Sequence, residues 1–167
     1  MPCLYRNQNF CNQFGGYKLR LVVQRVRGCT VIVDNSIVGS IDYGLLAYLG
    51  IKKGDTDKDL NYLVNKLLGL RIFKDKEGVM NLSVTDISGS VMIISQFTLC
   101  ADTRKGNRPS YNNAENPEIA KKYYLNFIKK LQETNLKISS GKFQADMDVS
   151  YTNDGPVTIL IDSEKKF

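Results

Sequence analysis

SVMIISQFTL, residues 90–99, is the most strand-like stretch of the 167-residue chain. Its first half is apolar and rich in β-branched side chains, which favour the pleated surface of a sheet. Three polar side chains, Ser95, Gln96 and Thr98, then interrupt a run that would otherwise belong to the core. The end of a buried strand beside a long loop is a common place for a functional site. A strand that turns its hydroxyl groups to solvent would explain the same residues.

Further strands and two helices are predicted around this stretch. The additional strands are expected at residues 19–26, 29–33, 37–41, 45–49, 70–73, 79–84, 146–152 and 157–162. Gly28 is expected to stop the first of them, and polar turns divide most of the others. Many hairpins with only two helices indicate an α+β fold, in which a mostly antiparallel or mixed sheet forms a barrel or sandwich.

The two helices are indicated by apolar residues at helical spacing and by capping residues. Thr56 caps the first, at residues 57–68, and Gly69 ends it. Asn116 caps the second, with Pro117 at its first position. The buried stripe of the second helix is expected to consist of Ile119, Tyr123, Phe127, Ile128 and Leu131.

The domain organisation follows from length and from the unusual start of the chain. A chain of 167 residues fits one domain. Residues 1–17 are polar and rich in Asn and Gln, so we expect a disordered N-terminal extension there. Residues 18–162 are expected to form the single domain, and residues 163–167 a short tail.

The composition limits the chemistry. The chain has no histidine, which excludes Ser-His-Asp, Cys-His and histidine–metal sites within one chain. Its four cysteines form no C-x-x-C pair, so we expect neither a metal nor a cofactor. The glycine motifs of phosphate loops and dinucleotide sites are missing as well.

Charge and hydropathy bear on partners and location. A net charge of +6 weakly favours a polyanionic partner such as a nucleic acid. No apolar run approaches the roughly 20 residues of a membrane-spanning helix, and no signal peptide is indicated. We therefore expect a cytoplasmic protein with reduced thiols and no membrane association.

Two loops could carry function. Arg104, Lys105 and Arg108 place three cations in one polar loop, which could hold phosphate groups or could equally be a solvated surface loop. NDGPVT, residues 153–158, predicts a turn between two strands. A Gly-Pro bond is also one of the few places where a cis peptide costs little.

SQFTL (residues 95–99) and NDGPVT (residues 153–158), in this order and spacing, resemble the D-aminoacyl-tRNA deacylases, also called D-tyrosyl-tRNA deacylases. The resemblance covers residues 18–162. Its supporting matches are QRV at 24–26, LRIF at 70–73, MNL at 80–82 and GKFQADM at 141–147.

The resemblance implies a cytoplasmic homodimer that hydrolyses the ester between a D-amino acid and the terminal ribose of tRNA, and that also removes glycine mischarged on alanine tRNA. Ser95, Gln96, Phe97 and Thr98 would form the catalytic segment. Backbone N–H groups near Phe97 and Thr98 would stabilise the oxyanion while a ribose hydroxyl assists the attacking water. Without a neighbouring base, Thr98 is a poor nucleophile.

The resemblance also implies how chirality is read. Gly155 and Pro156 would form a cis dipeptide that reaches into the partner subunit's pocket, so the active sites lie at the subunit interface. Arg25 would brace this dipeptide. Phe143 and Met147 would wall the adenosine or aminoacyl pocket, although plain core positions explain them equally well.

Three other functions compete with this hypothesis. A related editing enzyme of the same fold removes L-alanine from tRNA. The residue sequence NDGPVT resembles the D-specific group more closely. A nucleic-acid-binding module without catalysis is disfavoured because only residues 163–167 follow the last expected strand. A small-molecule esterase that uses Thr98 is disfavoured by the lack of histidine.

Overall fold

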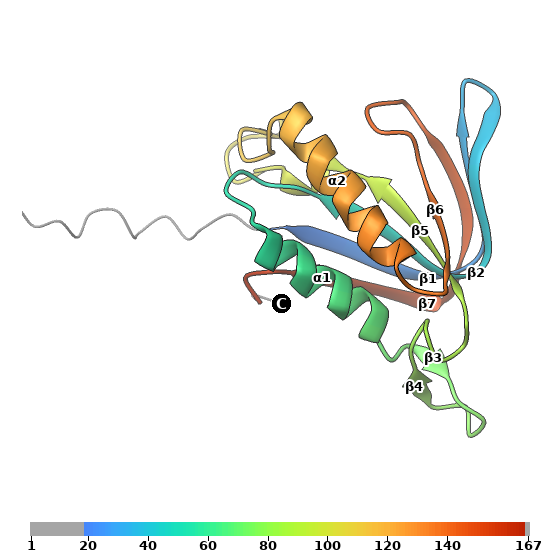
Figure 1. Ribbon diagram of the computed structural model, residues 1–167. Helices are drawn as coiled ribbons and strands as arrows, with labels where there is room; N and C mark the ends of the chain where they lie inside the picture. The colour runs from blue at the N-terminus through green and yellow to red at the C-terminus, as the bar shows by residue number, and fades with distance from the viewer. Residues whose placement is uncertain (1–18, 166–167) are drawn as a thin grey trace, which may run out of the picture.

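The computed structural model describes residues 19–165, in which two helices cover one face of a five-stranded sheet (Figure 1). The sheet has the strand order β6-β5-β2-β1-β7. Its strands are β1 (Arg20–Val33), β2 (Ser36–Gly50), β5 (Ser90–Ser95), β6 (Lys137–Ser140) and β7 (Asp148–Asp162). β5 runs parallel to β2 and β6, and the other pairs are antiparallel. The predicted α+β class with a mixed sheet is confirmed. These strands form one open layer, so closure into a barrel or sandwich is not confirmed.

β1 and β2 form one long hairpin where the sequence predicts four short strands. Asp34 and Asn35 make the turn with φ of 49° and 59°, which short polar residues tolerate. Gly28 does not end β1. The strand continues through Gly28, where its register against β7 shifts. Gly44, inside β2, pairs with Ser90, and a Cβ at Gly44 would lie 1.8 Å from the Ser90 carbonyl oxygen. Gly44 therefore does not end the strand, and its lack of a side chain allows β5 to approach closely.

β5 ends four residues before the predicted boundary. After Ser95 the chain leaves the sheet and forms the short 3₁₀ helix η1 (Phe97–Cys100). The predicted strand over residues 96–99 is therefore wrong. The loop predicted to follow is confirmed and is closed by paired backbone hydrogen bonds between Asp102 and Ser110, at 2.8 and 2.9 Å.

The helices are α1 (Asp57–Gly69) and α2 (Pro117–Gln132). The Thr56 N–H and hydroxyl both donate to the Asp59 carboxylate, at 3.0 and 2.6 Å. The Asn116 side chain accepts the Glu118 N–H at 2.9 Å. Both predicted starts are thus confirmed.

The buried stripe of α2 differs in part from the prediction. Tyr124 is buried with Phe127, Ile128 and Leu131, whereas Ile119 is 43% exposed. The Tyr124 hydroxyl donates to the Ile93 carbonyl of β5, at 2.9 Å. The other predicted stripe residue, Tyr123, is half-buried and donates to the Asp55 carbonyl at 2.9 Å.

Two apolar clusters lie on the two faces of the sheet. The larger joins both helices to alternate residues of β1, β2 and β5, among them Val23, Ala47 and Ile93. The smaller contains the neighbouring residues of the same strands, such as Leu46 and Met92. This alternation is the period of two that a strand requires.

β7 runs through the segment predicted as a turn between two strands. It pairs with β1 on both sides of that segment, Gln24 with Thr158 and Val26 with Asn153. Residues 154–157 are consequently out of register opposite Arg25, and the Gly155–Pro156 peptide within them is cis. The pairing of the flanking parts with one strand explains why they form a single element.

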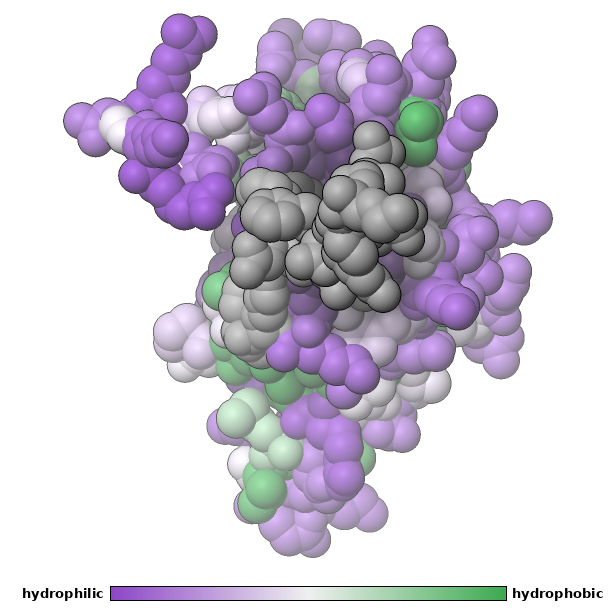
Figure 2. All heavy atoms as spheres, turned by 90° about the vertical axis from the view of Figure 1, so that its left-hand side faces the viewer, coloured by the Kyte–Doolittle hydropathy of each residue, from purple (hydrophilic) through white to green (hydrophobic). Residues whose placement is uncertain are grey.

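The hairpin of β3 (Phe73–Lys74) and β4 (Met80–Leu82) projects from the sheet, with shorter strands than predicted. Figure 2 shows a mostly hydrophilic face with apolar side chains at the lower end, at the level of this hairpin, where Val79 and Met80 are exposed. The predicted extension over residues 1–17 lies outside the described residues, as does the end of the predicted tail 163–167. Among the described residues, neither helix has the length and apolar character needed to cross a membrane.

Candidate active site

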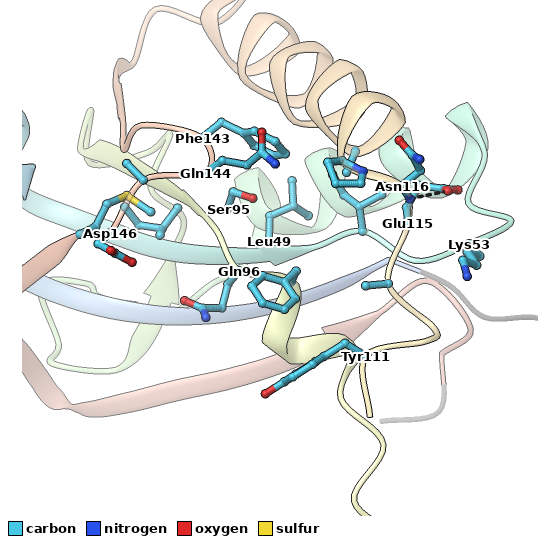
Figure 3. A pocket seen from close by; sticks show the side chains of 18 of the residues that line it. Leu49, Lys53, Ser95, Gln96, Tyr111, Glu115, Asn116, Phe143, Gln144 and Asp146 are labelled. Carbon is cyan, nitrogen blue, oxygen red and sulfur yellow. Dashed lines mark hydrogen bonds between the residues drawn. The ribbon is translucent and has the colours of Figure 1, made fainter. Parts of the chain in front are cut away.

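A cleft of about 820 Å³ lies between the end of β5, the start of α2 and the segment before β7 (Figure 3). It contains five of the residues that the sequence predicts for the site. These are Ser95, Gln96, Phe97, Phe143 and Met147. Residues not predicted also line it, among them Lys53, Tyr111, Glu115, Asn116 and Asp146.

The backbone just after the C-terminal end of β5 is fixed by neighbouring elements. The Gln96 N–H donates to the Leu49 carbonyl of β2 at 2.8 Å, and the Gln96 carbonyl accepts the Leu99 N–H at 3.2 Å. Phe97 and Thr98 then open η1, and the first N–H groups of a helix have no partner within it. Phe97 is 57% exposed, and its ring packs edge-on against Tyr111 with 5.0 Å between centroids. This segment can therefore present backbone donors beside an apolar surface.

Thr98 differs from its neighbours, because it is exposed and does not line the cleft. Its hydroxyl accepts a hydrogen bond from the Gln96 side-chain amide at 2.5 Å. An amide donor cannot remove a proton from the hydroxyl, so this contact does not activate Thr98 as a nucleophile. The four predicted catalytic residues are thus only partly brought together.

The buried thiols offer no alternative nucleophile. Burial raises the pKa of Cys29 and of Cys100 to about 11, so both are protonated near neutral pH. The Cys100 thiol donates to the Ile51 carbonyl at 3.4 Å. Both cysteines are structural.

Phe143 and Met147 line the cleft and also contact the core. The Phe143 ring lies 5.6 Å from the ring of Tyr124, and Met147 packs against the smaller apolar cluster. Both side chains are half-buried. Both sequence interpretations, pocket wall and core position, therefore hold, because each side chain lines the cleft and also contacts buried residues.

Arg25 and Gly155 lie at a second, open hollow of about 650 Å³. Arg25 is only 4% exposed, its Nε lies 2.9 Å from Asp154 Oδ2, and its Nη1 donates to the Ile72 carbonyl. Arg27 Nη2 lies 2.5 Å from Asp154 Oδ1. Partial burial would raise the pKa of the Asp154 carboxyl, but the hydrogen bond from Arg27 and the charge of Arg25 outweigh it and hold that pKa below its usual value.

The exposed Gly155–Pro156 segment is also tied from its other side. Asn153 Oδ1 accepts the Val157 N–H at 3.1 Å, and Asn153 Nδ2 donates to the Thr158 hydroxyl at 3.1 Å. Gly155 has a φ of +131°, and a Cβ there would lie 3.1 Å from Arg25 Nη2. Arg25 therefore lies against the dipeptide, where the resemblance places its brace.

Within one chain the two groups of predicted residues do not meet. Ser95 and Phe97 line the first cleft, whereas Arg25 and Gly155 line the second hollow. Pro156 is exposed and lines neither of them.

The predicted cationic loop is partly neutralised. Arg104 Nε and Nη2 lie 2.9 and 2.5 Å from the Asp102 carboxylate. The hydrogen bonds from Arg104 hold the pKa of Asp102 well below its usual value. Lys105 and Arg108 are exposed in the same loop.

The second hollow is also lined by Arg27, Tyr43 and Asp154, which sequence reasoning did not assign to the site. A signal for Arg27 was present, because Arg25-x-Arg27 puts two arginines on one side of a strand. Tyr43 is the cross-strand partner of Arg27, which only the register of the hairpin reveals.

Comparisons with known proteins identify the family of the chain. A family model described as D-Tyr-tRNA(Tyr) deacylase matches residues 22–162. A protein named D-aminoacyl-tRNA deacylase from Clostridium tetani is 56% identical over 149 residues, which make up 89% of this chain and 100% of that relative. One of the same name from Thermosipho melanesiensis is 53% identical over 150 residues, with 89% and 100% covered.

Solved structures share the fold. The structure of a c-Myc DNA unwinding element binding protein superposes with a TM-score of 0.81 at 40% identity, covering 85% of this chain and 97% of its own. A probable eukaryotic D-amino acid tRNA deacylase superposes with a TM-score of 0.71 at 17% identity, covering 87% and 99%. The match over residues 22–162 and the identity to full-length relatives show that this chain belongs to the D-Tyr-tRNA(Tyr) deacylase family.

Proposed function

We propose that residues 18–162 form a deacylase domain that hydrolyses the ester bond of D-aminoacyl-tRNA, and of glycine mischarged on alanine tRNA, in the cytoplasm. The observation that carries the proposal is the cleft at the end of β5, which Ser95, Gln96 and Phe97 line. Its volume of about 820 Å³ suits an aminoacyl-adenosine end. The net charge of +6 suits an RNA substrate.

The chemistry is carried by positioning. An aminoacyl ester is already activated, and the ribose 2′-hydroxyl next to it can assist an attacking water. The backbone N–H groups of Phe97 and Thr98 then stabilise the oxyanion, a contribution that is typically about 3 to 4 kcal/mol for one donor. Neither a histidine nor a covalent intermediate on Thr98 is required.

Chiral selection requires a second chain in this proposal. The exposed Gly155–Pro156 segment of one subunit enters the cleft of its partner in a two-fold homodimer, and its carbonyls hold the α-amino group of the substrate. Backbone groups test the configuration at the α-carbon, which every D-residue presents alike, and leave no room for an L side chain. The separation of the two hollows within one chain supports this arrangement. Phe143 and Met147 then bound the adenosine or aminoacyl group, and Lys105 and Arg108 contact tRNA phosphates with a smaller contribution from the paired Arg104.

Nucleic-acid binding without hydrolysis is the second candidate. It is favoured by the 40% identity to a structure titled as a DNA unwinding element binding protein. This candidate predicts binding of duplex DNA with no release of amino acid from any aminoacyl-tRNA.

The proposal is tested with a set of substrates. Purified protein is incubated with D-tyrosyl-tRNA, L-tyrosyl-tRNA, glycyl-tRNA on alanine tRNA, L-alanyl-tRNA and a simple nitrophenyl ester. We expect release of D-tyrosine and glycine, with little reaction of the other three. Preferential release of L-alanine would identify the related editing activity, and release from the simple ester alone would identify a small-molecule esterase.

Ser90→Ala is a matched control for Ser95→Ala, because the two serines begin and end the same strand. Only Ser95 lines the cleft, so only its substitution is expected to slow deacylation. Equal effects of both substitutions would contradict the assignment of the cleft.

A further inference from the structure

We propose that Asp154 is a positioning residue for the deacylation reaction and that Arg27 and Tyr43, together with Arg25, hold its carboxylate so that Gly155–Pro156 keeps one position. We call these four residues the Asp154 cluster. The inference rests on the proposed function, and it assigns Arg27 and Tyr43 a part in chiral selection.

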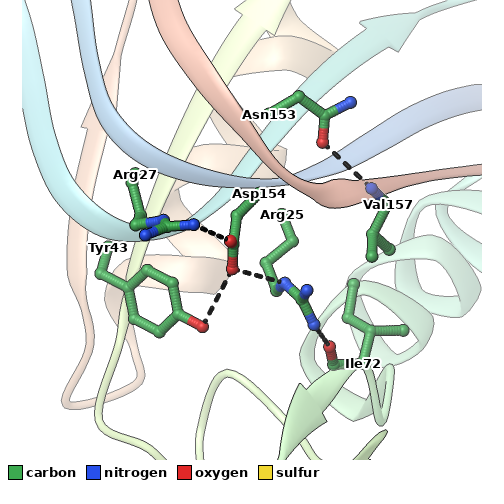
Figure 4. A network of polar contacts seen from close by, with 7 residues as sticks. All are labelled: Arg25, Arg27, Tyr43, Ile72, Asn153, Asp154 and Val157. Carbon is green, nitrogen blue, oxygen red and sulfur yellow. Dashed lines mark hydrogen bonds and ion pairs between the residues drawn. The ribbon is translucent and has the colours of Figure 1, made fainter.

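Two hydrogen-bond donors, Arg27 and Tyr43, and the charge of Arg25 converge on one carboxylate (Figure 4). Arg27 Nη2 lies 2.5 Å from Oδ1, while Arg25 Nε and the Tyr43 hydroxyl lie 2.9 and 3.5 Å from Oδ2. Asp154 directly precedes Gly155, so fixing the carboxylate restrains the peptide that leads into the exposed dipeptide. The Arg27 bond joins two ionised groups, and such hydrogen bonds are about twice as strong as neutral ones. Arg25 adds the attraction of a buried charge at 2.9 Å, so the two arginines are the principal restraints.

The donors themselves are held by the sheet and by the β3 segment. Arg27 and Tyr43 are direct cross-strand partners on β1 and β2. The Tyr43 ring packs edge-on against the buried Phe73, with 5.4 Å between centroids, and the Ile72 carbonyl accepts a hydrogen bond from Arg25. Each donor thus reaches Asp154 from a rigid element.

The tip of the segment depends on this support. Gly155 and Pro156 are both exposed, so neither is held by burial in a core. The Asn153 hydrogen bonds to Val157 and Thr158 restrain one side of the segment, and the Asp154 cluster restrains the other. Without the Asp154 cluster, only the Asn153 hydrogen bonds restrain the segment. The dipeptide then samples positions that admit an L side chain.

If Arg27 and Tyr43 only stabilised the fold, their removal would lower the Tm and leave the D/L ratio unchanged. The Arg27 side chain is 66% exposed and Tyr43 is 39% exposed, so both contribute little to the core. Their removal is expected to leave thermal stability almost unchanged. The readout that separates the two roles is therefore the ratio of D-tyrosyl-tRNA to L-tyrosyl-tRNA hydrolysis, measured beside the Tm.

The test uses Arg27→Gln, Arg27→Lys, Tyr43→Phe and the Arg27→Gln/Tyr43→Phe double variant of the full chain. We expect Arg27→Gln to lower the D/L ratio about tenfold, in line with the loss of one charge-assisted hydrogen bond. Arg27→Lys retains the charge and recovers part of the ratio. Tyr43→Phe keeps the ring contact with Phe73, and its long hydrogen bond predicts a smaller loss of about two- to threefold. The double variant tests whether the two donors act on the same carboxylate, since their effects then fail to multiply.

Arg71→Gln is the matched control, because Arg71 is an exposed arginine that donates to the Asn81 carbonyl at 2.7 Å outside both hollows. Its D/L ratio is expected to stay at the wild-type value. A wild-type protein that hydrolyses neither tyrosyl-tRNA would refute the proposed function itself. A discriminating wild type with an unchanged ratio in Arg27→Gln and Tyr43→Phe would refute the role of the cluster alone, as would a ratio that falls equally in Arg71→Gln.

Discussion

Arg25 and Asp154 form an ion pair with 2.9 Å between Nε and Oδ2, which joins a buried cation of β1 to the residue that precedes Gly155. The Arg25 side chain is 5% exposed and that of Asp154 is 15% exposed. A single interaction therefore connects the interior of the sheet with the segment proposed to read chirality.

The two arginines that contact Asp154 are expected to differ in their effect on stability. Arg25→Gln removes a buried cation that contacts both Asp154 and the Ile72 carbonyl, while Arg27 still pairs with Asp154, and should lower the free energy of unfolding by about 1–3 kcal/mol. Arg27 is mostly exposed, so Arg27→Gln should cost no more than about 1 kcal/mol. Urea unfolding of both variants measures the difference. Equal losses would contradict the distinction between a buried and an exposed pair.

Gly155→Ala is expected to lower deacylation of D-tyrosyl-tRNA at least tenfold, or to lower the D/L ratio by a similar factor, without unfolding the domain. A Cβ at Gly155 would lie 2.8 Å from Val157 Cγ2 and 3.1 Å from Arg25 Nη2, and φ is +131°. The backbone cost alone should be about 1–3 kcal/mol. The measurements are single-turnover kinetics and urea unfolding.

Gly78→Ala is the control for that substitution. Gly78 also has a positive φ, of +82°, but a Cβ there meets no atom of the described chain within 4 Å. It should lose stability and keep its activity. Equal losses of activity in both variants would show that backbone strain alone explains the effect.

Thr98→Ala is expected to retain substantial activity, since Thr98 is exposed and its hydroxyl contacts only an amide donor among the hydrogen bonds of the described residues. A tRNA ending in 2′-deoxyadenosine should in contrast be a poor substrate for the wild-type protein, because the assisting hydroxyl is gone. The first expectation is tested by the rate of Thr98→Ala with D-tyrosyl-tRNA, and the second by the wild-type rate with the 2′-deoxy substrate. Mass spectrometry of quenched reactions tests for an acyl group on Thr98. An acyl group trapped on Thr98 would establish covalent catalysis instead.

Asp55 predicts how stability depends on pH. Burial raises the pKa of its carboxyl to about 7, against the opposing hydrogen bond from the Lys52 N–H. The folded protein thus holds a proton that the unfolded chain releases near pH 4, so the free energy of unfolding should fall as the pH rises from about 4 to about 7, by up to about 4 kcal/mol.

Asp55→Asn should remove most of this slope in urea unfolding at pH 5 and pH 8. Asp57→Asn, an exposed acid in the first turn of α1, should keep it. A wild-type stability that rises between pH 5 and pH 7 would contradict the assignment.

Features with local signals were predictable from the sequence. Asn116 and Thr56 start their helices as capping residues do, and the turn at residues 75–78 closes its hairpin. These signals depend on residues within a few positions of one another. The motif also predicted a candidate site at the end of β5, where the structure has a cleft. The change of direction that leaves Thr98 outside the cleft was not predicted.

Features that depend on a neighbouring strand were not predictable in the same way. Gly44 fits a strand end when taken alone, and only the approach of Ser90 explains its place inside β2. The short strand β6 is defined by its pairing with β5. The contact of Tyr43 with Asp154 likewise requires the register that brings Tyr43 beside Arg27.

In the proposed homodimer, one active site combines the cleft of one subunit with the Gly155–Pro156 segment of its partner. The most direct test co-expresses a cleft variant (Ser95→Ala/Gln96→Ala) with a segment variant (Gly155→Ala), each carrying a different tag, and measures D-tyrosyl-tRNA deacylation by the purified mixed dimer. A mixed dimer then contains one site with both defects and one with neither, so about half of the wild-type rate is expected. Activity that stays as low as that of the two separate variants, or the failure of any mixed dimer to form, would contradict this arrangement.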